Sequence, residues 1–282
     1  MKKTVLIVED DALSRKLFGD ALTAEGYQVI TAEDGEAAVS ALEIESPDLM
    51  ITDVMMPKMD GITLIGRARE LRPSMRIVVM TSFSSTDIII GALRNKVIDF
   101  LPKPFGLDEL LSTIETVTNR CGECVIEVKS GKPDWIEVLL PCDLSVVEPM
   151  QKFFSHLQPN LSEEAREAIG AVFREMLNNA IEHGGKFDPS KFVEVKFVRF
   201  KHMVLYSIKD PGEGFDLNSV EHAAVSNPDD QPYRHLQVRK EKGIRPGGFG
   251  ILLAQQIIDE LVYNDKHNEL VFVKYLDRDQ DV

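Results

Sequence analysis

Short apolar runs alternate with amphipathic stretches along the first 120 residues of the chain. The runs lack strict alternation, which is typical of parallel strands buried on both faces. They predict strands over Thr4–Val8, Tyr27–Thr31, Leu49–Asp53, Ile77–Thr81 and Asp99–Leu101. The stretches between and after them predict helices over Ala12–Glu25, Gly35–Glu45, Gly61–Leu71, Thr86–Asn95 and Leu107–Asn119. Five alternations with short loops predict an α/β fold with a doubly wound, five-stranded parallel sheet.

The pattern changes after residue 120. Strands are predicted over Val125–Lys129 and Trp135–Leu140, and a hairpin over Val193–Phe200 and Met203–Lys209. Helices are predicted over Leu144–Leu157, from Ser162 through Ala180, and over Ile251–Val262. We therefore expect a first domain over residues 1–120, a linker over residues 121–134 that includes a short strand, and a second domain over residues 135–282.

Composition narrows the classes of function. The 282 residues, 44% apolar and 28% charged, are typical of a soluble globular protein with two cores. The net charge of −14 argues against nucleic acid as a direct partner. Met1-Lys2-Lys3 leads directly into a strand, and no apolar run approaches the ~18 residues that span a bilayer, so we expect no signal peptide and no membrane contact. Three cysteines favour the reducing cytoplasm, and Cys121 and Cys124 alone make a poor zinc site.

Carboxylates at the ends of two predicted strands form the first candidate site. Glu9, Asp10 and Asp11 follow the first strand, and Asp53 ends the third. Because parallel strands end on the same edge of a sheet, these groups should converge where open α/β sheets bind ligands. Like charges that converge repel unless a cation lies among them, and carboxylate oxygens favour Mg²⁺. The alternative is a set of solvated loop carboxylates.

A hydroxyl and an ammonium are expected at the same edge. Thr81 ends the fourth strand, and Lys103 follows the fifth. Beside a carboxylate nucleophile and a metal, they suit the transfer of a phosphoryl group to Asp53, because the cations balance the charge on the phosphoryl oxygens.

With these residues in place, residues 1–120 resemble a response-regulator receiver domain. The resemblance implies that Asp53 is the phospho-acceptor and that Thr81 and Lys103 sense the phosphate. It implies that Mg²⁺ is held by Asp53 together with Asp10, Asp11 and the Met55 carbonyl. It also matches Phe100 to the aromatic switch residue, Pro57 and Gly61 to the loop after the acceptor, and Lys103-Pro104 to a bond that is typically cis.

The second domain has its own candidates. Glu175 and Asn179 are four residues apart on the predicted long helix, so they share a face. A glutamate can deprotonate a hydroxyl and an amide oxygen can bind Mg²⁺, although such pairs are commonly surface residues. In the segment Asp210-Pro-Gly-Glu-Gly214, the carboxylate can accept a hydrogen bond from an amine such as that of adenine. The glycine run 247–250 precedes a helix and can offer N–H groups to phosphates, although each glycine segment alone is more often a turn.

In this order, the pieces resemble the ATPase domain shared by gyrase and histidine kinases, in the compact form of the anti-sigma-factor serine kinases. The resemblance covers about residues 125–280 and implies an α+β two-layer sandwich of the Bergerat type, with ATP and Mg²⁺ as cofactors. Glu175 would be the general base and Asn179 a Mg²⁺ ligand. Residues 216–246 would form the ATP lid. The implied nucleotide contacts are Asp210, Gly212 and Gly214 at the adenine, and Gly248 and Gly250 at the triphosphate.

Two features of the sequence bear on which activity the second domain has. Pro246 and Gly247 stand between Arg245 and Gly248, whereas the serine kinases tend to carry an arginine directly before the final glycine motif. No phosphorylatable histidine helix precedes the second domain, so we reject an autophosphorylating histidine kinase and interpret His183 as a cap of the helix end.

Joined, the halves predict a two-component response regulator in a partner-switching pathway. A sensor histidine kinase would phosphorylate Asp53, and the receiver would then control a serine kinase-like domain. That domain would phosphorylate an anti-anti-sigma (antagonist) protein with ATP, sequester a sigma factor, or both. The alternatives are a non-catalytic nucleotide-binding module that sequesters a sigma factor or antagonist, and a docking scaffold without nucleotide, so enzymatic activity stays open. The resemblance also suggests a homodimer.

Overall fold

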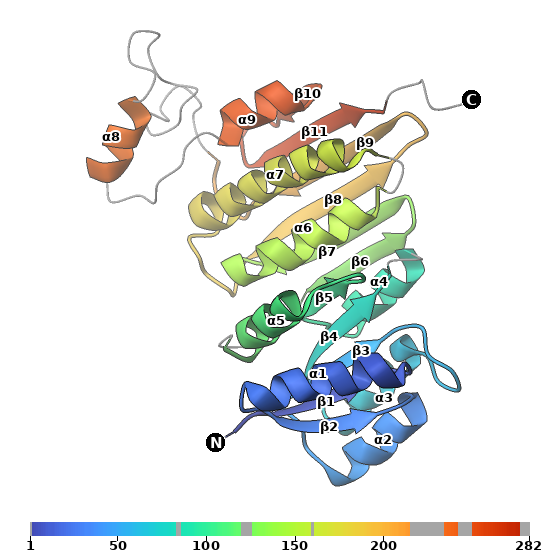
Figure 1. Cartoon of the computed structure of the whole chain (residues 1–282). Helices are drawn as coiled ribbons and strands as arrows, with labels where there is room; N and C mark the ends of the chain where they lie inside the picture. Colours follow the sequence, from blue (N-terminus) through green and yellow to red (C-terminus); the bar gives the residue numbers. More distant parts are fainter. Residues whose placement is uncertain are drawn as a thin grey trace. The chain divides into compact units, whose positions relative to one another are not determined.

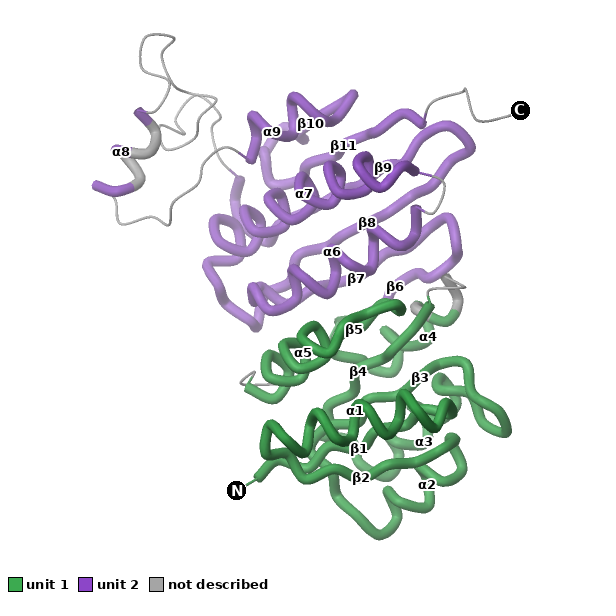
Figure 2. The backbone as a smooth tube through the Cα atoms, viewed as in Figure 1, with its two compact units in different colours: residues 1–126 green, residues 127–282 purple. Residues whose placement is uncertain are grey.

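The computed structural model describes residues 2–82, 86–119, 126–158, 161–214, 234–241 and 250–276 of the chain. The chain divides into two compact units, residues 1–126 and residues 127–282 (Figure 2). Each unit has its own sheet (Figure 1). None of the described helices combines the length and the apolar character that crossing a bilayer requires.

The first unit is a parallel five-stranded sheet in the order β2-β1-β3-β4-β5. Its strands are β1 (Thr4–Val8), β2 (Gln28–Ala32), β3 (Leu49–Asp53), β4 (Arg76–Thr81) and β5 (Asp99–Pro102). Its helices are α1 (Ala12–Ala24), α2 (Gly35–Ile44), α3 (Gly61–Leu71), α4 (Thr86–Arg94) and α5 (Leu107–Asn119). Helices α1 and α5 cover one face of the sheet, and α2, α3 and α4 the other (Figure 1). The predicted doubly wound α/β fold is confirmed.

The core of this unit explains why the strands lack alternation. Side chains on one face of the sheet pack against α1 and α5 in a single buried cluster that includes Val5, Ile7, Leu49, Ile51, Phe18, Leu22, Leu110 and Ile114. The intervening residues Leu6 and Met50 are also fully buried, on the opposite face. Burying one such side chain stabilises the fold by about 1.5–3 kcal/mol, so this sheet could not stand without helices on both faces.

The second unit is a six-stranded sheet in the order β10-β11-β9-β8-β7-β6, and every neighbouring pair is antiparallel. Its strands are β6 (Glu127–Lys132), β7 (Trp135–Pro141), β8 (Phe192–Arg199), β9 (Met203–Lys209), β10 (Glu260–Tyr263) and β11 (Glu269–Tyr275). A 3₁₀ turn, η1 (Leu144–Val146), leads into α6 (Val147–His156); the other helices are α7 (Glu163–Asn179), α8 (Arg234–Glu241) and α9 (Gly250–Ile257). Helices α6, α7 and α9 lie on one face of the sheet, so the unit is a two-layer sandwich (Figure 1).

Aromatic side chains fill the space between the two layers. Tyr206 of β9 lies 4.8 Å from Phe272 and 5.1 Å from Phe197, measured between ring centroids. Phe154 of α6 and Phe173 of α7 lie against Tyr206 from the helical side, each at 5.6 Å. Burial raises the pKa of Tyr206, and the Gln158 amide gives its hydroxyl a hydrogen-bond partner. A buried tyrosine normally requires such a partner.

One predicted helix of the second unit needs correction. The helix predicted over Ile251–Val262 ends at Ile257, and the next residues turn into the edge strand β10. The N–H of Asp259 donates to the carbonyl of Val273 on β11, and this hydrogen bond begins the pairing of β10 with β11. The sequence pattern did not indicate β11. A continuous apolar run fits a buried helix or a strand equally well, and pairing with β11 decides between them. The short strand expected over Val125–Lys129 is present as β6, which supplies the edge of this sheet.

Candidate functional site

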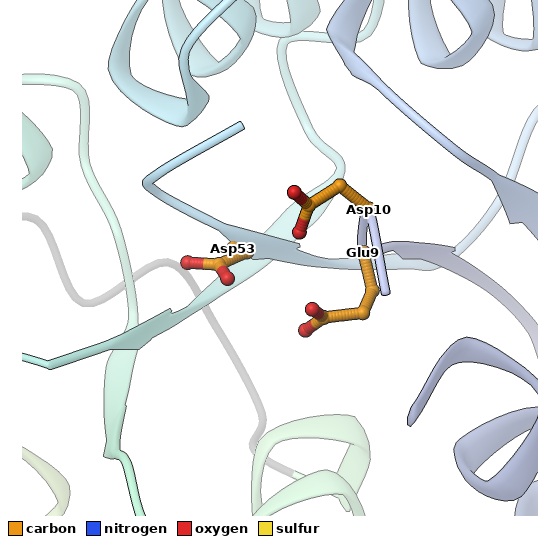
Figure 3. A group of neighbouring side chains, drawn as sticks. All are labelled: Glu9, Asp10 and Asp53. Atoms are coloured by element: carbon orange, nitrogen blue, oxygen red, sulfur yellow. The ribbon is translucent and has the colours of Figure 1, made fainter. Parts of the chain in front are cut away.

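The end of β3 and the end of β1 meet at one edge of the first sheet. Val8 pairs with Thr52, so the residues that follow β1 lie beside Asp53. Carboxylate oxygens of Glu9, Asp10 and Asp53 all lie within 4.8 Å of one another. Figure 3 shows the carboxyl groups of Glu9 and Asp10 extending toward Asp53. Oxygen donors in such a set suit a hard divalent cation such as Mg²⁺, which would offset the repulsion among them.

Lys103 joins the carboxylates of this edge. Its Nζ lies 2.6 Å from Asp53 Oδ2 and 2.8 Å from Glu9 Oε2. Burial lowers the pKa of Lys103, but the hydrogen bonds to Asp53 and Glu9 outweigh it and hold that pKa above its usual value. Burial raises the pKa of Glu9, and the ammonium of Lys103 only partly offsets this effect. The ammonium is therefore positioned to neutralise negative charge added at Asp53.

The acidic cluster differs from the predicted one at Asp11. The Asp11 carboxylate is turned toward α1, where it caps the helix by accepting the Ser14 N–H at 2.7 Å. This hydrogen bond lowers the pKa of Asp11. Glu9, which is 2% exposed, takes the place beside Asp53 that we expected of Asp11. The sequence held the necessary signal, because an aspartate directly before an amphipathic helix is a strong N-cap.

The backbone around Asp53 fixes the direction of its side chain. Asp53 Oδ1 accepts the Met55 N–H at 3.1 Å, which leaves Oδ2 to Lys103. The Met55 side chain is 62% exposed. The first residue of α3, Gly61, lies so close that a Cβ atom there would be 2.2 Å from the Asp53 carbonyl oxygen. Only glycine allows this approach of helix and strand end.

The other predicted receiver residues lie on β4 and β5. Thr81 ends β4, one residue beyond the partner of Asp53 in the strand register, and is 2% exposed. Its carbonyl accepts the Lys103 N–H at 2.8 Å. Phe100 on β5 is 1% exposed, so its ring is buried in this structure. The Lys103-Pro104 peptide bond is cis. Thr81 and Lys103 are therefore carried to the edge that holds Asp53.

In the second unit, α7 and the start of α9 bring three predicted residues together. A Cβ atom on Gly250 would lie 3.3 Å from Cβ of Glu175 and 3.4 Å from Nδ2 of Asn179. The face of α7 that carries Glu175 and Asn179 thus packs directly against the N-terminus of α9. Gly248 and Arg245, together with most of the predicted lid, lie outside the described residues; α8 is the described part of that lid.

The loop that follows β9 begins with Asp210 and packs against Gly184. Asp210 Oδ1 accepts the Gly212 N–H at 2.7 Å, and a Cβ atom on Gly184 would collide with the Asp210 carboxyl group at 2.2 Å. Gly184 ends a π-helical turn that continues α7, and such turns are frequent at functional sites. Burial raises the pKa of Asp210, and the hydrogen bond from Gly212 offsets part of this effect.

Sequence reasoning missed Asn268, which lies before β11. Its amide nitrogen donates to the carbonyls of Asp210 at 3.4 Å and Gly212 at 3.2 Å. A single asparagine in a polar turn gives no signal of such a contact, because the contact depends on the pairing of β9 with β11.

Known proteins match each unit separately. Residues 5–115 match the response regulator receiver domain, and residues 140–274 match the histidine kinase-like ATPase domain. The chain therefore joins a response-regulator receiver domain to a histidine-kinase-like ATPase domain. A receiver is typical of two-component response regulators and implies a phosphodonor such as a sensor kinase, and the ATPase domain implies ATP binding.

Curated relatives align with the receiver. The DNA-binding transcriptional regulator NtrC of Klebsiella pneumoniae is 34% identical over 117 residues, which is 42% of this chain and 25% of that protein. The transcriptional regulatory protein PdtaR of Mycobacterium tuberculosis is 38% identical over 122 residues, which is 43% of this chain and 59% of PdtaR. The chain thus spans about a quarter of the first of these proteins and somewhat more than half of the second.

Solved structures are similar over the same region. A CheY-like receiver domain protein from Methanospirillum hungatei is 28% identical with a TM-score of 0.41, covering 42% of this chain and 95% of that one. The chemotaxis response regulator CheY4 of Vibrio cholerae is 28% identical with a TM-score of 0.40, covering 42% of this chain and 99% of its own.

Proposed function

We propose that this chain is a response regulator in which phosphorylation of Asp53 controls an ATP-dependent, anti-sigma-factor-like serine kinase domain. The observation that carries the proposal is that one chain holds two separate groups of residues whose chemistry suits phosphoryl transfer. One site is Asp53 with Lys103, and the other is Glu175 and Asn179 packed against Gly250. The first site would receive the signal, and the second would deliver the output.

At the first site, the Asp53 carboxylate would attack the phosphorus of a phosphohistidine on the sensor kinase. A P–O bond forms to Asp53 as the P–N bond to the donor imidazole breaks. Lys103 lies 2.6 Å from the nucleophile and would balance charge on the transferred group. Glu9, Asp10 and Asp53 would hold Mg²⁺, which supplies further charge neutralisation at the phosphoryl oxygens. Thr81 would accommodate the product from the neighbouring strand.

At the second site, Asp210 would accept a hydrogen bond from the adenine amino group, with Gly212 and Gly214 close to the base. Asn179 would hold Mg²⁺ on the triphosphate, and Gly248 and Gly250 would bind the phosphates. Glu175 would take the proton of a substrate serine while the serine oxygen attacks the γ-phosphorus and ADP leaves. The substrate would be an antagonist protein of the anti-anti-sigma type.

The connection between the units argues for a serine acceptor over autophosphorylation on histidine. Helix α5 ends at Asn119 and β6 begins at Glu127, so only residues 120–126 lie between the last helix of the first sheet and the first strand of the second. A helical hairpin that carries a phosphorylatable histidine needs far more chain than that. A histidine segment between receiver and ATPase domain is therefore excluded by length.

One sequence feature favours a second candidate. Arg245 is separated from Gly248 by Pro246 and Gly247, and the serine kinases tend to place an arginine directly before this glycine motif. If no arginine reaches the γ-phosphate, the domain would bind ATP without transferring phosphate. The chain would then sequester a sigma factor or antagonist protein under the control of its receiver.

The test is phosphate transfer from labelled Mg-ATP to candidate antagonist proteins. The full chain is compared with Glu175→Gln, and with Glu167→Gln, a control on the exposed part of α7. Serine phosphorylation that Glu175→Gln abolishes and Glu167→Gln retains supports the kinase. ATP binding without transfer to any candidate favours the sequestering module, and transfer that survives Glu175→Gln removes Glu175 as the base.

A further inference from the structure

The turn between β10 and β11 lies directly against the loop that carries Asp210. A Cβ atom on Gly214 would lie 1.5 Å from the carbonyl oxygen of Lys266, and Gly214 has a φ of +86°. The Asp210 N–H donates to the carbonyl of Asn268 at 2.9 Å, which extends the pairing of β9 with β11 beyond the strands. The position of the Asp210 loop is thus set by residues 58 positions later in the chain.

The side chains of two asparagines complete this contact. Nδ2 of Asn268 donates to the carbonyls of Asp210 and Gly212 at 3.4 and 3.2 Å. Carbonyl oxygens only accept, so the amide nitrogen must face them, and Oδ1 of Asn268 is left to accept from Nδ2 of Asn264 at 2.9 Å. Oδ1 of Asn264 then accepts the N–H groups of Asn268 and Glu269 at 3.1 and 3.2 Å. Both amides therefore have one permitted orientation.

We propose that Asn268, held by Asn264, is a positioning residue that sets the Asp210 carboxylate for recognition of an adenine amino group. The proposal rests on the proposed function, in which Asp210 anchors the adenine. Asn268 holds the carbonyls on either side of the Asx turn that Asp210 makes with Gly212. That turn engages Oδ1 of Asp210 and leaves Oδ2 for the amine. Asn268 acts through the loop and need not touch the nucleotide.

The sharpest variant is Asn268→Asp, which keeps the size of the side chain and removes its donors. A carboxylate would then face two carbonyl oxygens, so the loop has to move and Asp210 with it. We expect the Kd for Mg-ATP to rise about tenfold or more, as for the loss of one or two ordinary hydrogen bonds. We also expect the preference for ATP over inosine triphosphate to fall, because inosine carries an oxygen in place of the amino group.

Three further variants separate positioning from charge and from folding. Lys266→Gln lies in the same turn and lowers the net charge by one, as Asn268→Asp does, but leaves the Lys266 carbonyl in place; we expect an unchanged nucleotide preference. Asn268→Ala removes the donors without adding repulsion, and Asn264→Asp keeps the two bonds from N–H groups but not the one to Asn268. Both should lie between wild type and Asn268→Asp.

Isothermal titration calorimetry of the full chain measures the Kd values for Mg-ATP and Mg-inosine triphosphate and so tests the role of Asn268. Circular dichroism melts show which variants fold. A wild type that binds neither nucleotide, or binds both equally, overturns the adenine anchor and this inference together. A wild type that prefers ATP, with the preference intact in Asn268→Asp and Asn268→Ala, overturns the role of Asn268 alone. If Asn268→Asp does not fold, Asn268→Ala gives the answer.

Discussion

At the residue scale, the first site brings three carboxylates close to one another and one ammonium into contact with two of them. Glu9 and Asp53 both lie within 2.8 Å of Lys103, and Asp10 shares their oxygen cluster. The ammonium contacts one oxygen of each of two carboxylates in the cluster, so we expect it to compete with a divalent cation for them. After phosphorylation, the same charge would be free to bind the phosphoryl group.

Replacing Lys103 should therefore strengthen metal binding. In the nucleotide-free protein, we expect Lys103→Met to lower the Kd for Mg²⁺ about tenfold, which corresponds to about 1.4 kcal/mol. Calorimetric titration with Mg²⁺ measures the change. Lys58→Met is the matched control, because Lys58 forms an ion pair with Asp34 away from the acidic cluster. An unchanged or weaker affinity in Lys103→Met would show that the lysine does not compete with the metal.

The second site contains a carboxylate that costs stability. Burial raises the pKa of Asp210 above its unfolded value, so ionising this carboxyl costs stability. The cost is absent below the unfolded pKa and is complete once the pH has risen through the folded pKa. Asp210→Asn should thus raise Tm at neutral pH, by about 1–2 °C because partial exposure screens the charge. The gain should disappear as the pH falls below about 3, where the carboxyl is neutral in both states.

The same substitution should change nucleotide choice. The Gly212 N–H donates to Oδ1 of Asp210, so in Asp210→Asn the amide oxygen keeps that bond and the amide nitrogen faces the nucleotide. A donor would then oppose the adenine amino group, and we expect ATP binding to weaken and inosine triphosphate to gain relative to ATP. Asp265→Asn, at an exposed position of the β10–β11 turn, is the control. Competition binding with both nucleotides checks the result, and an unaltered preference would contradict it.

At the scale of elements, close contacts between helix starts and strand ends hold the first site. Gly61 begins α3 against the carbonyl of Asp53, whereas Gly66 in the same helix has only Asn95 Oδ1 at 4.0 Å. We expect Gly61→Ala to destabilise the end of β3 by about 1–3 kcal/mol through overpacking. Gly66→Ala should stabilise α3 by up to about 1 kcal/mol.

Hydrogen exchange is the appropriate measurement for this pair, because a chain of two units need not unfold in one step. Peptides that cover β3 should exchange faster in Gly61→Ala and no faster in Gly66→Ala. Equal exchange in both variants would show that the contact at Gly61 relaxes without cost.

Elements with one strong local signal could be predicted from the sequence, and those that depend on distant pairing could not. The bounds of β1, β3, α3, α5 and β9 agree with the pattern of apolar residues. The end of α9 and the whole of β10 depend on hydrogen bonds to β11, such as that from Asp259 to Val273. At the sites, the placement of Asp53 and Lys103 on one edge followed from parallel strand order. Glu9 lies beside Asp53 in place of Asp11 because α1 begins directly after Asp11, which caps it. The contact of Asn268 with the Asp210 loop depends on the pairing of β9 with β11, which no local pattern indicates.

At the scale of the whole molecule, the chain joins a receiver domain to a histidine-kinase-like ATPase domain. A covalent connection by itself does not make one domain control the other. Regulation requires that the two binding equilibria be coupled, and coupling between two sites is a free energy with a definite sign and size. It is also reciprocal, because each ligand must change the affinity of the other by the same factor.

If Asp53 is the phospho-acceptor, as we propose, beryllofluoride with Mg²⁺ would mimic a phosphoryl group on it and would allow this coupling to be measured at equilibrium. If the receiver controls the ATPase domain, saturating beryllofluoride should change the Kd for ATP by about 5-fold or more, the usual lower range for allosteric coupling. ATP should then change the apparent affinity for beryllofluoride by the same factor. Asp53→Asn removes the proposed acceptor and should abolish both effects while leaving ATP binding itself intact. Equal ATP affinities with and without beryllofluoride would mean that the receiver governs the choice of partner protein or nothing at all, and binding of the candidate antagonist in the same two states would distinguish these outcomes.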